Sequence, residues 1–80
     1  MIPPRIKNVK AFDNYDLELE YANGEKRRYS MRKQLEHTYY QALKNVPYFL
    51  LVKSAETTVE WPNGEDVDPN ELYSNSTKIL

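Results

Sequence analysis

Hydrophobic and polar residues alternate on either side of two Asn-Gly pairs, which contain the only two glycines of the chain. An Asn-Gly pair between alternating segments is typical of a β-hairpin, because both residues tolerate the positive φ angles of a tight turn. The pattern therefore predicts one hairpin around Asn23-Gly24 and a second around Asn63-Gly64.

The expected register follows from how the side chains sort onto two faces. In the first hairpin, a three-residue loop that ends in a glycine bulge separates apolar from polar side chains, whereas a two-residue loop mixes them. We apply the same register to the second hairpin. The expected apolar pairs are Leu17 with Tyr29 and Val59 with Val67. The expected polar pairs are Glu18 with Arg28, Glu20 with Lys26 and, unfavourably, Glu60 with Asp66.

Between the hairpins, apolar residues at three- and four-residue spacing predict one amphipathic helix, with a break near His37-Thr38 compatible with the pattern. Ser30 is suited to cap its start, and Pro47 follows its end. The expected buried stripe is Met31, Leu35, Tyr39, Ala42, Leu43 and Val46.

After the second hairpin, Asp68 is an acidic N-cap and Pro69 stands at the first helical position, which predicts a short helix through Leu72 and Tyr73. A first strand with a bulge is expected over residues 5–12, before a turn at Asp13-Asn14. The order is βββ–α–ββ–α. Hairpin connections favour an α+β fold, namely a mainly antiparallel sheet of about five strands packed against the longer helix.

Composition and charge narrow the class of protein. Eighty residues correspond to a single domain, residues 1–80, and a content of 40% hydrophobic and 29% charged residues is typical of a globular chain. The net charge of −1 provides no overall basic field for nucleic acid or anionic lipid. The charges are uneven, because residues 1–54 carry a balance of +4 and residues 55–80 a balance of −5. The two parts either neutralise each other or form two faces with different partners.

The chain contains no cysteine, which excludes disulfides and sulfur-ligated metal sites and favours a cytoplasmic location. The longest apolar run, Val46 to Val52, is far shorter than the roughly 18 residues of a spanning helix. The first residues, Met1 to Arg5, carry no apolar signal segment. We therefore expect a protein that is neither secreted nor inserted in a membrane.

Residues 59–73, VEWPNGEDVDPNELY, resemble the signature of a bacterial family catalogued as domain of unknown function 2442. The signature places W-P-N-G-x-D before P-x-x-L-Y at this spacing, and an aromatic-x-N-G-E hairpin matching Tyr21 to Glu25 precedes it. The matching positions are Trp61, Pro62, Asn63, Gly64, Asp68, Pro69, Leu72 and Tyr73. Family members usually carry glycine before the fourth strand, where this chain has Glu56.

The resemblance implies a small α+β domain without an assigned activity. Such domains are often encoded beside another small protein, so the product of a neighbouring gene is a candidate partner, and some are joined to a helix-turn-helix segment. Most residues of the signature are explained by structural roles. Asn63-Gly64 supplies a turn, Trp61 a large apolar anchor, and Asp68-Pro69 a helix cap.

Catalytic chemistry finds little support in the sequence, so we expect no enzyme and no cofactor. His37 is the only histidine, and the serines lie at predicted caps or loops. The alternative is a nucleic-acid-binding protein or a metal-independent ribonuclease of a toxin–antitoxin-like pair. Its candidate residues are Arg27, Arg28, Arg32, Lys33, His37 and Tyr40.

No metal site is expected. The run from Asp66 to Asn70 begins like a calcium loop but has Glu71 in place of glycine at the sixth position and Thr77 in place of glutamate at the twelfth. A weak cation site at Glu60 and Asp66 competes with simple neutralisation by Lys or Arg from neighbouring strands.

The leading hypothesis is an interaction or regulatory module without turnover that binds another protein, since an antiparallel sheet with a free face or edge can dock a second chain. Nucleic acid is a less favoured partner, because stacking by the seven tyrosines is limited: Tyr21, Tyr29 and Tyr39 fall on apolar faces, which leaves Tyr40 and Tyr48 exposed. The unequal surface charges predict the contact rim. Its candidate residues are Lys26, Arg28, Arg32, Lys33, Glu60 and Asp66.

Overall fold

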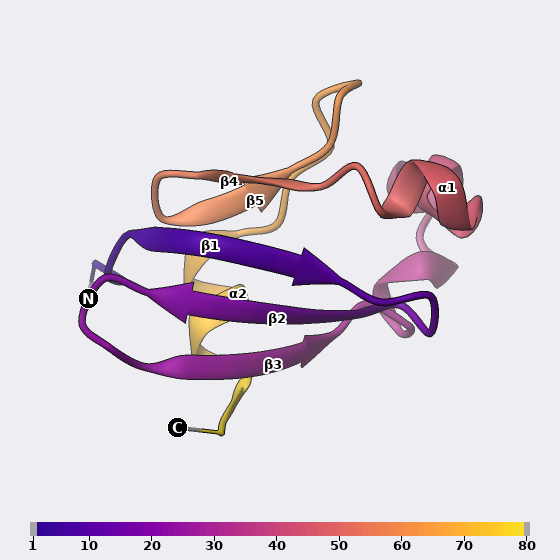
Figure 1. Ribbon diagram of the computed structural model, residues 1–80. Helices are drawn as coiled ribbons and strands as arrows, with labels where there is room; N and C mark the ends of the chain where they lie inside the picture. Colours follow the sequence, from indigo (N-terminus) through magenta and orange to yellow (C-terminus); the bar gives the residue numbers. More distant parts are fainter. Residues whose placement is uncertain (1, 80) are drawn as a thin grey trace.

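The computed structural model describes residues 2–79, which form an α+β fold of antiparallel sheets and short helices. The described elements, in chain order, are β1 (Ile6–Ala11), β2 (Asp16–Tyr21), β3 (Lys26–Ser30), the 3₁₀ segments η1 (Gln34–Glu36) and η2 (Thr38–Lys44), α1 (Val46–Phe49), β4 (Lys53–Ala55), β5 (Thr58–Glu60), α2 (Pro69–Ser74) and β6 (Thr77–Lys78). In Figure 1, β4 and β5 lie beside β1, and α2 lies behind the sheet that contains β1, β2 and β3.

The main sheet has the strand order β1-β2-β3-β6 and contains the first Asn-Gly turn. The register predicted for β2 and β3 is confirmed, since Leu17 pairs with Tyr29 and Glu18 with Arg28. Gly24 has a φ of +92°, and its amide donates to the Tyr21 carbonyl at 3.0 Å. The bulge expected in β1 is also present, as a register shift between Ile6 and Asn8.

The second Asn-Gly pair forms its turn but not the predicted hairpin. Gly64 has a φ of +99° and donates to the Trp61 carbonyl at 2.8 Å, yet the chain beyond the turn makes only an isolated bridge, Glu60 with Asp66. Strand β5 pairs instead with β4, in a separate two-stranded sheet.

Two physical reasons account for this correction to the single sheet of about five strands. The Glu60–Asp66 pair sets like charges opposite each other, whereas β4 places Lys53 opposite Glu60. The helix cap at Asp68 also ends the extended segment two residues after the bridge. The strands of the second hairpin therefore do not pair beyond this single bridge.

The predicted longer helix between the hairpins is wrong. The segment contains η1, η2 and the four-residue α1, and extended backbone at His37 separates η1 from η2 near the expected break. The Thr and Tyr residues of this segment favour helix only weakly.

The change of helix type also changes which side chains are buried. Segment η2 is kinked at Tyr40, and Tyr40 and Leu43, three residues or one 3₁₀ turn apart, are its buried residues. Tyr39, predicted to be in the stripe, is 56% exposed, and Ala42 is exposed as well. Met31 and Leu35 are buried as predicted.

The short C-terminal helix α2 is confirmed. The Asp68 side chain accepts a hydrogen bond from the Asn70 amide at 2.9 Å, and Pro69 occupies the first turn. Leu72 is fully buried, and the ring of Tyr73 packs edge-on against Tyr21 with centroids 5.0 Å apart. These contacts hold α2 against the inner face of the sheet. The edge of β3 that faces away from β2 pairs with β6.

A single apolar core joins the main sheet to the later segments. The fully or almost fully buried large side chains are Leu17, Leu19, Tyr21, Met31, Leu43, Phe49, Val59, Trp61, Val67 and Leu72. The Trp61 indole packs on Phe49 with ring centroids 5.7 Å apart, and its N–H donates to the Phe49 carbonyl at 2.8 Å. None of the helices in the described part of the chain has the length and apolar character needed to cross a bilayer.

Candidate functional site

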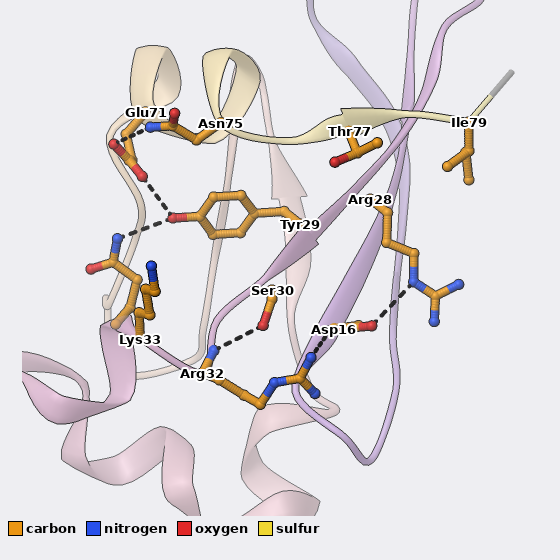
Figure 2. Close-up of a pocket in the computed structure, with 11 residues that line it drawn as sticks. Asp16, Arg28, Tyr29, Ser30, Arg32, Lys33, Glu71, Asn75, Thr77 and Ile79 are labelled. Atoms are coloured by element: carbon orange, nitrogen blue, oxygen red, sulfur yellow. Dashed lines mark hydrogen bonds and ion pairs between the residues drawn. The ribbon is translucent and has the colours of Figure 1, made fainter.

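A groove of about 760 Å³ lies along the open edge of β3. One wall comes from the end of β3 and the turn after it, residues 28–34, and the other from α2, β6 and Ile79. The groove exists because β6 is only two residues long and pairs with Arg27 and Arg28, so the last part of β3 has no neighbouring strand on the side away from β2. Figure 2 shows the lining side chains around this open edge.

Two guanidinium groups converge on one carboxylate in the floor of the groove. Arg28 Nε lies 3.3 Å from Asp16 Oδ2, and an Arg32 terminal nitrogen lies 3.6 Å from Asp16 Oδ1 (Figure 2). Asp16 is largely buried, with 15% of its side chain exposed, whereas the Arg28 and Arg32 side chains are 38% and 58% exposed. Asp16 therefore positions two arginines that keep part of their N–H donors toward solvent.

Neighbouring groups orient these arginines further. The Arg28 guanidinium stacks over the Phe12 ring at 4.4 Å from its centroid, and Arg32 donates to the Asn14 carbonyl at 2.8 Å. Asp16 Oδ1 itself accepts no hydrogen bond from any described residue, since the Arg32 contact is longer than a hydrogen bond.

Lys33 supplies a third positive charge to the groove. Its side chain is exposed, and no carboxylate of residues 2–79 lies within 4.0 Å of its ammonium group. The lining contains three cations and two carboxylates, Asp16 and Glu71, so its formal charge is +1. The groove is thus mildly basic in a chain whose net charge is −1.

A chain of hydrogen bonds centred on Tyr29 links the two walls. Its hydroxyl donates to Glu71 Oε2 at 3.0 Å and accepts from Gln34 Nε2 at 3.0 Å. Asn75 Nδ2 donates to the other Glu71 oxygen at 2.7 Å. Burial of the ring raises the pKa of Tyr29, the Gln34 hydrogen bond opposes this, and Glu71 adds to it. Tyr29 therefore stays protonated and fixes Glu71 in place.

The structure brings together only three of the six predicted rim residues: Arg28, Arg32 and Lys33 line the groove. Lys26 pairs with Glu20 in the sheet and is outside the groove. Glu60 and Asp66 lie at the second turn, where Asp66 Oδ1 accepts a hydrogen bond from the Tyr39 hydroxyl at 3.2 Å.

The residues proposed for a ribonuclease are dispersed. Arg27 points to the inner face, where it bonds Glu25 at 2.6 Å and Ser76 Oγ at 2.6 Å and lies over the Tyr73 ring. His37 is exposed and does not line the groove. Tyr40, predicted to be exposed, is 9% exposed and donates to the Asp66 carbonyl at 2.7 Å.

The sequence did not reveal the hydrogen-bond network of the groove, which Gln34, Glu71 and Asn75 form with Tyr29. In the sequence, Glu71 drew attention as the residue that interrupts a calcium loop. The spacing of Glu71 and Asn75, four residues apart on one helix, places them on the same side and is the one signal that connects them.

The signature segment around Trp61 forms a turn that tyrosine side chains from the preceding helical segments support. Tyr48 donates to Glu65 Oε1 at 2.7 Å and accepts from the Asn63 amide at 2.8 Å, while Tyr39 and Tyr40 hold Asp66. Desolvation raises the pKa of Tyr48, and burial raises that of Tyr40 to about 12. Among residues 2–79, no group of three or more His, Cys, Asp or Glu could hold a metal ion.

These observations describe a small α+β domain with a mildly basic groove at a sheet edge. The family model described as "Protein of unknown function (DUF2442)" matches residues 6–78, and the chain belongs to this family. Comparison with curated proteins and with solved structures gives no match.

Proposed function

We propose that this chain is a non-enzymatic module that binds another protein through the groove at the edge of β3. The observation that supports the proposal is the convergence of Arg28, Arg32 and Lys33, which adjacent stretches of chain bring to one open groove. A groove of this volume, with fixed polar groups on both walls, is typical of a binding site.

The charge of the groove favours a protein partner over nucleic acid. A site for phosphates gathers several unopposed cations, whereas here Asp16 and Glu71 oppose two of the three positive charges. The alternative, a nucleic-acid-binding protein or a metal-independent ribonuclease, needs a denser basic surface and the histidine, which lies elsewhere. We place this module in the cytoplasm, the location that a sequence without cysteine favours.

Capture from an extract of the source organism tests the proposal when it is tied to the groove. The wild-type chain is compared with Lys33→Glu and with Lys44→Glu, which makes the same change of charge on an exposed residue outside the groove. We expect a protein that survives nuclease treatment to be retained by the wild type and by Lys44→Glu and to be lost from Lys33→Glu.

Two results would contradict the proposal. Retention that disappears on nuclease treatment would indicate a nucleic-acid partner. Cleavage of RNA by the purified chain without added metal, abolished by Arg28→Ala or His37→Ala while circular dichroism shows a folded protein, would indicate the ribonuclease.

A further inference from the structure

We infer that the groove takes a carboxylate carried by an extended segment of the partner protein, and that the main chain of Ser30 anchors this segment. The inference rests on the proposed function and names the chemistry of its ligand. Three features carry it: an open main-chain edge at Ser30, a surplus of donors beside that edge, and a formal charge of +1.

The open edge follows from the hydrogen-bond pattern of β2 and β3. In an antiparallel pair, bonded and non-bonded residue pairs alternate. The Tyr21 amide bonds the Glu25 carbonyl, and the Met31 amide bonds the Tyr15 carbonyl. The Asp16–Ser30 pair between these positions is therefore non-bonded, and the N–H and C=O of Ser30 point away from β2, toward the groove.

Strand β6 does not cover these groups. It pairs with Arg27 and Arg28, and the Ile79 amide donates to the Lys26 carbonyl at 2.7 Å. The residue that would lie opposite Ser30 in this register is Asn75, which belongs to the end of α2 and not to the strand. An extended segment that lies in the groove can therefore exchange main-chain hydrogen bonds with Ser30, which is how sheet edges recognise peptides.

The side chains beside Ser30 select an acidic ligand. Lys33 has no carboxylate partner among residues 2–79, and Arg28 and Arg32 each make one ion-pair contact with Asp16. On the opposite wall, each oxygen of Glu71 already accepts one hydrogen bond, from Tyr29 or from Asn75. The free groups are mainly donors, so the ligand group that satisfies them is an acceptor.

Charge and volume distinguish a peptide carboxylate from a phosphate or a free small acid. One carboxylate matches the formal charge of +1, whereas a phosphodiester chain brings successive charges past Asp16 and Glu71. A volume of about 760 Å³ exceeds the needs of one carboxylate and fits a ligand of several residues. Ile79, 47% exposed, lies across the view from Lys33 in Figure 2 and offers an apolar contact.

Peptide titration monitored by ¹⁵N–¹H NMR tests the inference with the whole chain. The probe is the synthetic peptide acetyl-Val-Val-Glu-Val-Val-amide, its control is the peptide with Gln in place of Glu, and hexauridylate is the nucleic-acid probe. We expect the acidic peptide to shift the Ser30 amide and the groove resonances and to bind at least tenfold more tightly than either comparison.

Variants separate the side-chain part from the main-chain part. Lys33→Met is expected to weaken the acidic peptide about fivefold, the size of one partly exposed ion pair, and Lys44→Met to leave binding unchanged. Ser30→Pro removes the N–H and is expected to weaken binding, whereas Ser30→Ala keeps it and binds normally. If Ser30→Pro fails to fold, slowed hydrogen exchange of the wild-type Ser30 amide on peptide binding is the same test.

Equal binding of the acidic and neutral peptides, tighter binding of hexauridylate, or an unperturbed Ser30 amide at saturating peptide would each overturn the inference. Its failure is distinguishable from that of the proposed function. If extract capture still depends on Lys33 while the acidic peptide leaves the groove unperturbed, a protein partner remains and the acidic extended segment is wrong.

Discussion

The two Asn-Gly turns share their local chemistry and differ in the strand pairing beyond them. Both turns have an aromatic residue two positions before Asn, Tyr21 or Trp61, and both glycines have positive φ angles. The first turn continues into a fully paired hairpin, whereas the second continues into one isolated bridge. A turn is therefore specified by its own residues, but the strands beyond it form only where their cross-strand neighbours are compatible.

The second turn compensates with contacts from distant parts of the chain. Tyr39, Tyr40 and Tyr48 bond its residues, and the Trp61 indole bonds the Phe49 carbonyl. The first turn continues into its own β-ladder and has hydrogen bonds within the turn, such as that from the Glu25 amide to Asn23. It also accepts a distant contact, from the Tyr73 hydroxyl to Glu25 Oε2 at 2.8 Å. Substitutions at equivalent positions are expected to affect the two regions differently.

The largest effect is expected at Trp61. Its side chain is 1% exposed, so Trp61→Ala should lower the free energy of unfolding by about 3–5 kcal/mol, most of the stability of a domain this small. Trp61→Phe keeps an aromatic ring but removes the indole hydrogen bond to the Phe49 carbonyl, which keeps only the longer bond from the Val52 amide at 3.4 Å, and should cost about 1–3 kcal/mol. Urea unfolding followed by circular dichroism measures both. No loss in Trp61→Phe would show that the indole hydrogen bond does not anchor the turn.

The glycines provide a smaller and more symmetrical test. At both Gly24 and Gly64, an added Cβ would meet nothing within 4 Å, so the cost of alanine is the backbone strain of a positive φ. Each Gly→Ala substitution should lower stability by about 1–2 kcal/mol. Asparagine, which tolerates this conformation better, is the control and should cost less at both sites.

A clear inequality between Gly64→Ala and Gly24→Ala would separate the two turns. A larger loss at Gly64 would mean that distortion of the turn also breaks its tyrosine contacts. Equal losses, measured by the same unfolding assay, would mean that the turn geometry is local in both regions.

The features that sequence could predict are those set by neighbours in the chain. The register beside Gly24 and the helix cap at Asp68 each depend on a few adjacent residues, and both are present. The 3₁₀ segments are not predictable in this way, because contacts such as Tyr40 with Asp66, 26 residues apart, decide their course. Glu56 shows the same limit: its φ of +57° is a backbone conformation that glycine adopts most easily, but the sequence alone does not reveal it.

The groove obeys the same rule. Arg28, Arg32 and Lys33 are close in sequence and could be nominated as a basic group. Glu71 and Asn75 join them only because α2 packs near the end of β3, more than 40 residues later in the chain. The charge of the groove, and hence the kind of ligand it favours, depends on this non-local packing.

The smallest effect at neutral pH is expected at Tyr21, the counterpart of Trp61. Its hydroxyl is buried and bonds no described residue, so Tyr21→Phe removes an unsatisfied group and should leave stability unchanged or raise it by up to about 1 kcal/mol. Tyr40→Phe is the matched control from the second turn. Because its hydroxyl bonds the Asp66 carbonyl, this variant should lose about 0.5–1.5 kcal/mol.

Alkaline pH tests the same pair by a different route. Burial raises the pKa of both Tyr21 and Tyr40 to about 12, above the value near 10 of an unfolded chain. Between these values the unfolded state releases a proton that the folded state keeps, so wild-type stability should fall as the pH rises through this window. Each Phe variant should reduce this loss of stability by the contribution of the tyrosine that it removes. Only Tyr40→Phe should be less stable than the wild type at pH 7. If Tyr21→Phe loses as much stability at pH 7 as Tyr40→Phe, the Tyr21 hydroxyl has a bonding partner, and the difference between the two turns is smaller than the structure indicates.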